Sequence, residues 1–202
     1  MAALLLVTSL ATGCSRSLIV ARPEEQKLDE AYAELFVQES AQRVQDGDIV
    51  LRRGYAVLSD VITVVTGGVG VSHAGIYDAT TGTVIEAVDG GVTERALTDY
   101  VQWSHRVVIV RPNVSSADKR AAVTQARAAI GTPFDYSGFV GLDDPDRFYC
   151  SELVAWAYHA EERGFHGGVL VAPSELVALG DVVYDSGARG ARPLAAVPAY
   201  WR

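Results

Sequence analysis

The chain has 202 residues, enough for one domain with a substantial hydrophobic core and too few for two ordinary domains. Hydrophobic residues make up 49% and charged residues 21% of it, which argues against intrinsic disorder and against a coiled coil. A formal net charge of −8, with no cluster of lysine or arginine, makes nucleic acid an unexpected partner. Two cysteines and four histidines are too few for most structural zinc modules, and we expect neither a metal nor a cofactor.

The N-terminus has the pattern of an export signal. Residues 2–10 (AALLLVTSL) form an apolar run far shorter than the ~20 residues that a membrane-spanning helix needs. Small residues follow and lead into Cys14, as in a bacterial lipobox, in which the cysteine becomes the lipidated first residue of the mature protein. We therefore expect a signal peptide over 1–13, a lipidated tether over 14–23 and a membrane-anchored lipoprotein of the bacterial envelope. A buried N-terminal segment is the alternative interpretation.

The remaining residues, 24–202, are expected to form a single domain. Short or alternating apolar runs bounded by turn residues predict strands, and amphipathic or alanine-rich runs predict helices. In chain order the expected elements are a helix at 24–45, a strand beginning at 48–51, an apolar segment at 55–66 that fits a short buried helix or a strand, strands at 72–77, 83–88 and 92–95, a helix at 96–103, a strand at 106–111, a helix at 116–130, an irregular stretch at 132–148, a helix at 150–163, a short helix at Pro173 and a strand at 181–185. Strands between two helical ends indicate an α+β fold rather than a doubly wound sheet.

Cys150 is the candidate nucleophile. With Cys14 lipidated, it is the one thiol left in the chain and has no partner for an intramolecular disulfide. It begins the helix expected at 150–163, where free backbone N–H groups and the helix dipole favour the thiolate, the form that attacks carbonyl carbon. The buried stripe of that helix is expected to contain Tyr149, Leu153, Trp156, Ala157 and Ala160. The alternative is a small buried hydrophobic residue, as most free cysteines are.

A thiolate nucleophile needs a base that later protonates the leaving group, and histidine titrates in the required range. His159 lies about two and a half turns along the cysteine's own helix, which is too far to reach the thiol. His105 lies at a helix-to-strand junction and His166 in a glycine-rich loop. His73 lies in a strand between small residues that leave room beside it, although a strand histidine by itself is more often structural.

Glu86 lies in the neighbouring strand between Ile85 and Ala87, where a carboxylate is costly unless it has a partner. A hairpin turning at 79–82 brings Glu86 close to the level of His73. Its carboxylate can then bond the far imidazole nitrogen, as the third member of a catalytic triad does. The alternative is a glutamate that faces outward from its strand.

Six sequence blocks occur in an order that resembles a known superfamily. They are GDIVLRRG (47–54), SHAGIY (72–77), VIEAVDGGV (84–92), VIVRP (108–112), GTPFDY (131–136) and FYCSELVAWAY (148–158). They are similar to the circularly permuted branch of the NlpC-type papain-like superfamily, the YiiX/YebB-like proteins. In the unpermuted enzymes the cysteine helix comes first, whereas here the histidine strand leads and the cysteine helix follows. The resemblance covers about residues 46–178.

The resemblance implies a papain-like α+β fold in which the cysteine helix packs on a small antiparallel sheet. It also implies that Cys150 is the nucleophile, His73 the base and Glu86 the residue that orients the imidazole. These are the three residues that the chemistry of the sequence singles out independently.

The oxyanion hole is where the sequence departs from the superfamily. The unpermuted enzymes carry a tyrosine near the oxyanion, and the matching position here is Phe134, which has no hydroxyl. Tyr136 is one replacement, and the backbone N–H of Cys150 acting alone is another. Ser151, directly after the nucleophile, is a further candidate for the substrate pocket.

The expected activity is hydrolysis of an amide through an acyl-thioester on Cys150. By resemblance, the leading substrate is a peptidoglycan stem peptide. One alternative keeps the same Cys–His pair in a lipid acyl hydrolase or acyltransferase, with the apolar segment 55–66 lining an acyl groove. The other alternative is a non-catalytic lipoprotein that binds a small ligand in a degenerate site, for which Phe134 is the main support.

Overall fold

The computed structural model describes residues 22–55, 70–138, 142, 144–165 and 170–191. The expected signal peptide, Cys14, nearly all of the 55–66 segment and His166 lie outside these residues. The described elements are α1 (Gln26–Arg43), β1 (Ile49–Arg53), β2 (His73–Asp78), β3 (Thr83–Val88), β4 (Gly91–Ala96), α3 (Leu97–Gln102), β5 (Arg106–Pro112), α4 (Ser116–Ala128), α5 (Cys150–Ala157), the 3-10 helix η2 (Pro173–Leu179) and β6 (Gly180–Asp185). The predicted α+β class is confirmed.

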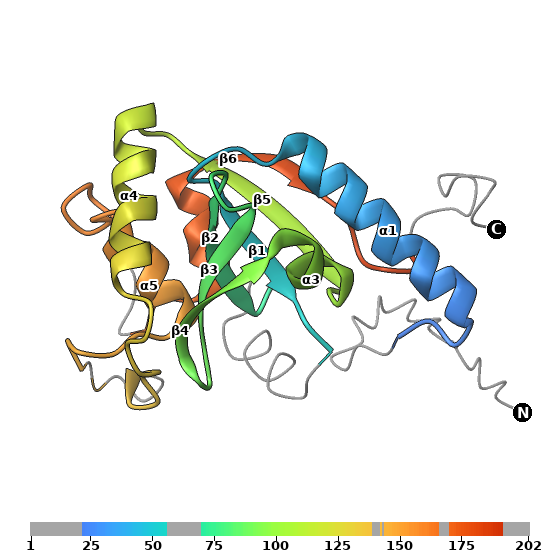
Figure 1. Cartoon of the computed structure of the whole chain (residues 1–202), viewed down its shortest axis with the longest axis horizontal. Coiled ribbons are helices and arrows are strands. Elements are labelled where there is room, and N and C mark those ends of the chain that lie inside the picture. Colours follow the sequence, from blue (N-terminus) through green and yellow to red (C-terminus); the bar gives the residue numbers. More distant parts are fainter. Residues whose placement is uncertain (1–21, 56–69, 139–141, 143, 166–169, 192–202) are drawn as a thin grey trace, which may run out of the picture.

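Within the described residues, the strands form one antiparallel sheet in the order β4-β3-β2-β1-β5-β6. Helices cover both of its faces, with α4, α5 and η2 on one side and α1 and α3 on the other (Figure 1). Because side chains alternate along a strand, β1 sends Ile49 and Leu51 toward α5 and Val50 toward α1. The central strands are therefore buried on both faces, and the packing on both sides fixes the positions of the side chains at their ends.

Helix α5 is shorter than the sequence predicts. It ends at Ala157 instead of residue 163, and His159 has a φ of 47°, a left-handed conformation that a helix cannot continue through. Trp156, expected in the buried stripe, is 40% exposed, whereas Leu153 and Val154 are fully buried against the sheet. Cys150 is the first residue of this short helix and lies in its buried first turn.

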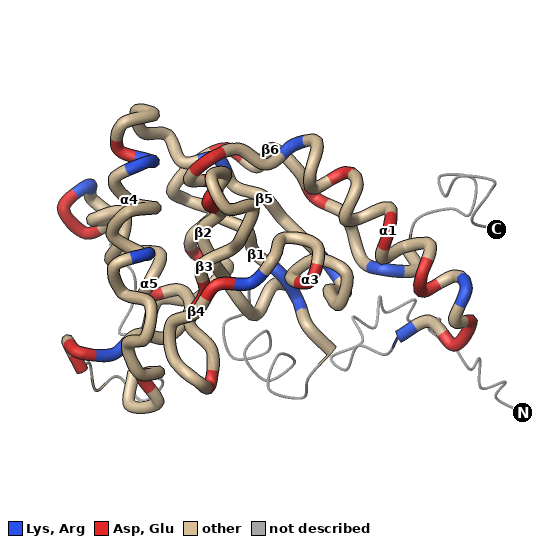
Figure 2. Tube along the Cα trace, viewed as in Figure 1, with Lys and Arg blue, Asp and Glu red and all other residues tan. Residues whose placement is uncertain are grey.

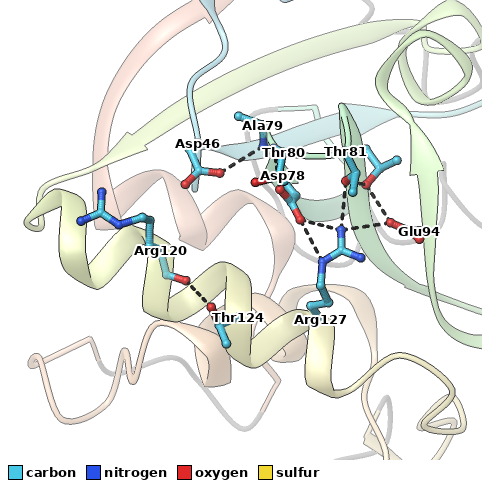
Figure 3. Close-up of polar contacts among 10 residues, drawn as sticks. Asp46, Asp78, Ala79, Thr80, Thr81, Glu94, Arg120, Thr124 and Arg127 are labelled. Carbon is cyan, nitrogen blue, oxygen red and sulfur yellow. Dashed lines mark hydrogen bonds and ion pairs between the residues drawn. The ribbon is translucent and has the colours of Figure 1, made fainter.

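A polar network fixes α4 to the turn between β2 and β3 (Figure 3). Arg127 of α4 bonds the buried Asp78 through Nε at 2.9 Å and Nη2 at 2.5 Å, and also bonds Thr81 at 2.9 Å and Glu94 at 3.1 Å. Arg120, two turns earlier on the same helix, points away from this network (Figure 3). The hairpin that carries His73 and Glu86 is thus anchored at its turn as well as within the sheet. None of the helices in the described part of the chain is both long and apolar enough to cross a membrane.

Candidate active site

Cys150 is the first residue of α5, and the residue before it, Tyr149, is extended with φ −95° and ψ 170°. The carboxylate of Glu152 accepts a hydrogen bond from the backbone N–H of Tyr149 at 3.0 Å, which fixes the start of the helix. The cysteine is 5% exposed, so the thiol is largely shielded from solvent at the helix N-terminus. Both features match the position that the sequence indicates for a reactive thiol.

His73 is the first residue of β2, so its imidazole lies at the end of the strand and not in the middle of the sheet. Its Nε2 is 2.5 Å from Oε2 of Glu86, and its side chain is 16% exposed. The imidazole is also close enough to the Cys150 thiol for each group to shift the pKa of the other. Because Nε2 is taken by Glu86, Nδ1 is the nitrogen that serves the thiol. The structure therefore brings together the three residues that the sequence predicts as a triad.

Glu86 reaches His73 diagonally across a glycine. In the β2–β3 register Glu86 lies opposite Gly75, two residues beyond His73, and positions two apart share one face of a strand. A Cβ on Gly75 would lie 2.5 Å from Cγ1 of Val84 and 2.8 Å from the carbonyl oxygen of Ile85, so there is no room for one. The missing side chain of Gly75 therefore lets β3 lie this close to β2 at the level of Glu86.

The Glu86 carboxylate is fully buried and is met by two arginines besides His73. Arg95 of β4 donates from Nε to Oε1 at 2.6 Å, and Nη2 of Arg52 on β1 lies 3.7 Å from Oε2. Burial raises the pKa of Glu86, but the hydrogen bond and charge of His73, together with the arginines, bring the pKa down to about 2. Glu86 is therefore an anion over the whole physiological range.

The thiol and the imidazole shift each other's pKa in opposite directions. Burial raises the pKa of the Cys150 thiol, but the charge and hydrogen bond of His73 outweigh it, and the pKa falls below its ordinary value. Burial lowers the pKa of His73, but Cys150 and Glu86 outweigh it, and the pKa rises. A lowered thiol pKa beside a raised imidazole pKa is the electrostatic arrangement of a thiolate–imidazolium pair.

The three residues expected around the oxyanion, Ser151, Tyr136 and Phe134, have different surroundings, and only Ser151 is next to the nucleophile in the chain. Ser151 is next to the nucleophile, with Oγ 4.0 Å from Sγ, but its hydroxyl donates to the carbonyl of Val171 at 2.7 Å. Tyr136 is 58% exposed, and its hydroxyl donates to the side chain of Asp89 in the β3–β4 turn. Phe134 packs against Tyr136 with ring centroids 5.0 Å apart. Both hydroxyl groups therefore have acceptors of their own within the domain.

Two other histidines lie in the described residues and have different surroundings. His159 is half exposed, with Nδ1 3.6 Å from Glu162 on the same turn. His105 packs edge-on against Tyr55 at 5.6 Å between ring centroids. No group of three or more His, Cys, Asp or Glu side chains that could hold a metal ion occurs in the described part of the chain.

The sequence did not indicate Arg52, Arg95 or Tyr100 as parts of the site. Tyr100 of α3 packs its ring 5.9 Å from the His73 ring and 4.6 Å from the guanidinium of Arg52. The sequence does place the two arginines in the strands on either side of the His73–Glu86 hairpin. Their contact with Glu86 follows only from the register of the β1–β2, β2–β3 and β3–β4 pairs, which no local sequence pattern supplies.

A profile of the permuted papain-like amidase family, YaeF/YiiX, C92, matches residues 43–169. Among solved structures the chain is similar to yiiX from Escherichia coli O157:H7, described as a metalloprotein, with 27% sequence identity and a TM-score of 0.51. That similarity covers 58% of this chain and 66% of the yiiX chain, just under two thirds of its length. No curated protein sequence matches significantly.

The family match spans well over half of the 202 residues and contains His73, Glu86 and Cys150. The structure adds an antiparallel sheet with the cysteine at the start of a packed helix and the histidine at a strand end, as the permuted papain-like fold requires. This chain therefore belongs to the permuted papain-like amidase family YaeF/YiiX, a family of cysteine hydrolases.

Proposed function

We propose that the chain is a thiol-dependent amidase that uses Cys150 as nucleophile, His73 as acid and base, and Glu86 as the group that orients the imidazole. The observation that carries the proposal is the arrangement of His73, whose Nε2 lies 2.5 Å from the buried Glu86 carboxylate and whose imidazole lowers the pKa of the Cys150 thiol at the start of α5. The same three groups account for each proton transfer that amide hydrolysis needs.

In the first half-reaction the Cys150 thiolate attacks the amide carbonyl carbon and forms a carbon–sulfur bond. The imidazolium of His73 then donates the proton on Nδ1 to the amide nitrogen, and the carbon–nitrogen bond breaks to release the amine. An acyl-thioester and a neutral imidazole remain. In the second half-reaction His73 takes a proton from water, the hydroxide adds to the thioester, and Cys150 leaves as thiolate with release of a carboxylic acid.

Glu86 supports both halves by accepting the Nε2–H of His73, which leaves Nδ1 facing the thiol. For the oxyanion we assign the backbone N–H of Cys150, because the first N–H groups of a helix have no acceptor within it. The hydroxyls of Ser151 and Tyr136 are bonded elsewhere in the structure and would have to leave Val171 and Asp89 to contribute.

The substrate that we propose is a peptidoglycan stem peptide, cleaved at an amide by an enzyme anchored in the bacterial envelope through Cys14. The support is the family and the lipobox-like N-terminus of the sequence. The lipid-acyl alternative depends on the apolar segment 55–66, which lies outside the described residues except for Tyr55.

The test is hydrolysis of purified peptidoglycan fragments by the wild type and by Cys150→Ala, followed by mass spectrometry of the products. The wild type should release one new amine and one new carboxylic acid per cut, and Cys150→Ala should release neither. Activity that survives in Cys150→Ala would contradict the thiol mechanism, and a wild type inert on all peptide fragments would contradict the substrate. Since yiiX is described as a metalloprotein, each reaction should be repeated with a chelator, which the proposed mechanism predicts to be harmless.

A further inference from the structure

The buried Glu86 carboxylate is surrounded by charged and titratable groups from every neighbouring element. These groups are Arg52 on β1, His73 on β2, Arg95 on β4, Tyr100 and the more distant Asp99 on α3, and, beyond the imidazole, Cys150 on α5. Figure 2 shows basic residues on β1 and β4, the two strands that flank the β2–β3 hairpin. The site therefore has cations on both sides of its acidic member.

The charge balance of the site requires at least one of these arginines. A thiolate on Cys150, an imidazolium on His73 and the carboxylate of Glu86 together carry one net negative charge in a largely buried setting. Burying an uncompensated charge is costly, and such a site lowers the cost by neutralising one of its groups. Protonation of Glu86 would remove the acceptor for His73, and loss of the proton from His73 would leave the thiolate without its partner.

We propose that Arg52 and Arg95 are positioning residues, which keep the Glu86 carboxylate ionised and aimed at His73 and so set the pH range in which the Cys150–His73 pair is reactive. This inference rests on the proposed role of that pair in catalysis. It adds two residues that do not touch the reacting atoms.

The two arginines act differently because their contacts differ. Arg95 donates directly to Oε1 at 2.6 Å, which holds one carboxylate oxygen while the other accepts from His73. Arg52 lies 3.7 Å from Oε2, and its guanidinium rests on the Tyr100 ring. We therefore expect Arg95 to supply the direction of the carboxylate as well as charge, and Arg52 to supply mainly charge.

The sign of the expected effect follows from the charge removed. A nearby cation stabilises the Cys150 thiolate and destabilises the His73 imidazolium. Burial lowers the pKa of His73 most and the charge of Arg52 lowers it further, whereas Cys150 and Glu86 raise it. Replacing either arginine by a neutral residue should therefore raise the pKa of both Cys150 and His73. The whole pH window of the reactive pair should move upward instead of only losing amplitude.

The experiment is the rate of iodoacetamide alkylation of Cys150 against pH, which needs no substrate. In the wild type the midpoint should lie below the value of an ordinary thiol, ~8.5. In Arg95→Met and in Arg52→Met it should move up by about 0.5–1 pH unit. Arg95→Lys, which keeps the charge, should recover most of that shift.

Arg120→Met is the matched control, because it removes the same charge from an exposed site on α4 and Arg120 is not among the groups that surround Glu86. Its midpoint should equal that of the wild type. A uniform fall in rate without a shift in Arg95→Met and Arg52→Met would overturn the inference in favour of a purely structural role. An ordinary thiol midpoint in the wild type would instead overturn the proposed Cys150–His73 pair itself. Circular dichroism identifies a variant that has not folded, and the other arginine variant then decides.

Discussion

Replacing Gly75 by alanine tests whether the close approach of β3 to this residue is what allows Glu86 to reach His73. The added Cβ would lie 2.5 Å from Cγ1 of Val84, 2.8 Å from the carbonyl oxygen of Ile85 and 3.5 Å from Cβ of Glu86. The first two separations are well inside van der Waals contact, and the second involves backbone, which cannot rotate away. The β2–β3 pair must therefore separate locally, and the carboxylate must move with it.

The expected cost can be bounded from these contacts. Overpacking of a well-packed interior costs about 1–3 kcal/mol, whereas replacing an unstrained glycine by alanine otherwise gains about 0.4–1 kcal/mol through the unfolded state. Gly75 has an ordinary strand conformation, so the steric cost should dominate. We expect Gly75→Ala to lower the free energy of unfolding by about 1–3 kcal/mol and to slow Cys150 alkylation near neutral pH.

Gly90→Ala is the matched control for this prediction. Gly90 lies in the turn after β3, has no left-handed φ, and an added Cβ there meets nothing within 4 Å. Urea unfolding and the alkylation rate of both variants give the comparison. If Gly75→Ala unfolds at the same urea concentration as Gly90→Ala and keeps wild-type alkylation, then Gly75 is not needed for the contact between Glu86 and His73, and the reasoning fails.

Two further predictions concern buried carboxylates. Arg127→Met should lower the free energy of unfolding by about 1–2 kcal/mol at neutral pH, because it leaves the buried Asp78 carboxylate without its guanidinium, while Arg120→Met should change little. Burial raises the pKa of Asp78, but Arg127 outweighs it and the pKa falls below its ordinary 3.8. This difference should therefore be lost as the pH falls from 3.8 through the lowered pKa of Asp78, and a persistent difference at lower pH would exclude the ion pair as its cause. The pKa of Glu86, raised by burial but lowered overall by His73 to about 2 from an ordinary 4.5, corresponds to stability on the order of 3 kcal/mol. That stability should be present above pH 4.5 and lost as the pH falls toward 2, a loss that urea unfolding of Glu86→Gln should not show.

Most elements of the fold were predictable because their signals are local. The strands at 72–77 and 83–88 differ by one residue at most from β2 and β3, since turn residues bound short apolar runs on both sides. The helix beginning at Cys150 was predicted at its start but not at its end. Ala160 lies on the expected helical stripe and is buried, but it reaches the core through an irregular turn after His159 adopts a left-handed φ. A burial pattern alone does not distinguish that path from a continued helix.

In the candidate site, too, the residues with a local sequence signal were predicted, and those that depend on strand pairing were not. Cys150 was indicated by its place at a helix start, and Glu86 by the cost of a carboxylate among apolar strand residues. The expectation that Glu86 lies near the level of His73 is nearly right, because it faces Gly75 and reaches His73 along the diagonal. Arg52 and Arg95 could not be assigned, since their relevance depends on the pairing of β1 with β2 and of β3 with β4.

The permuted order of the chain is compatible with the proposed chemistry, because the contacts among the proposed triad residues do not depend on the connection between the two halves of the chain. His73 and Glu86 are placed by β2 and β3, which pair with each other and face Tyr100 on the α1 and α3 side of the sheet. Cys150 is placed by α5, whose Leu153 and Val154 pack on the opposite side with Ala74. The thiol and the imidazole meet at the end of β2, so their relative position is set by how α5 packs on the sheet. A chain that provides this helix before or after the hairpin can build the same pair.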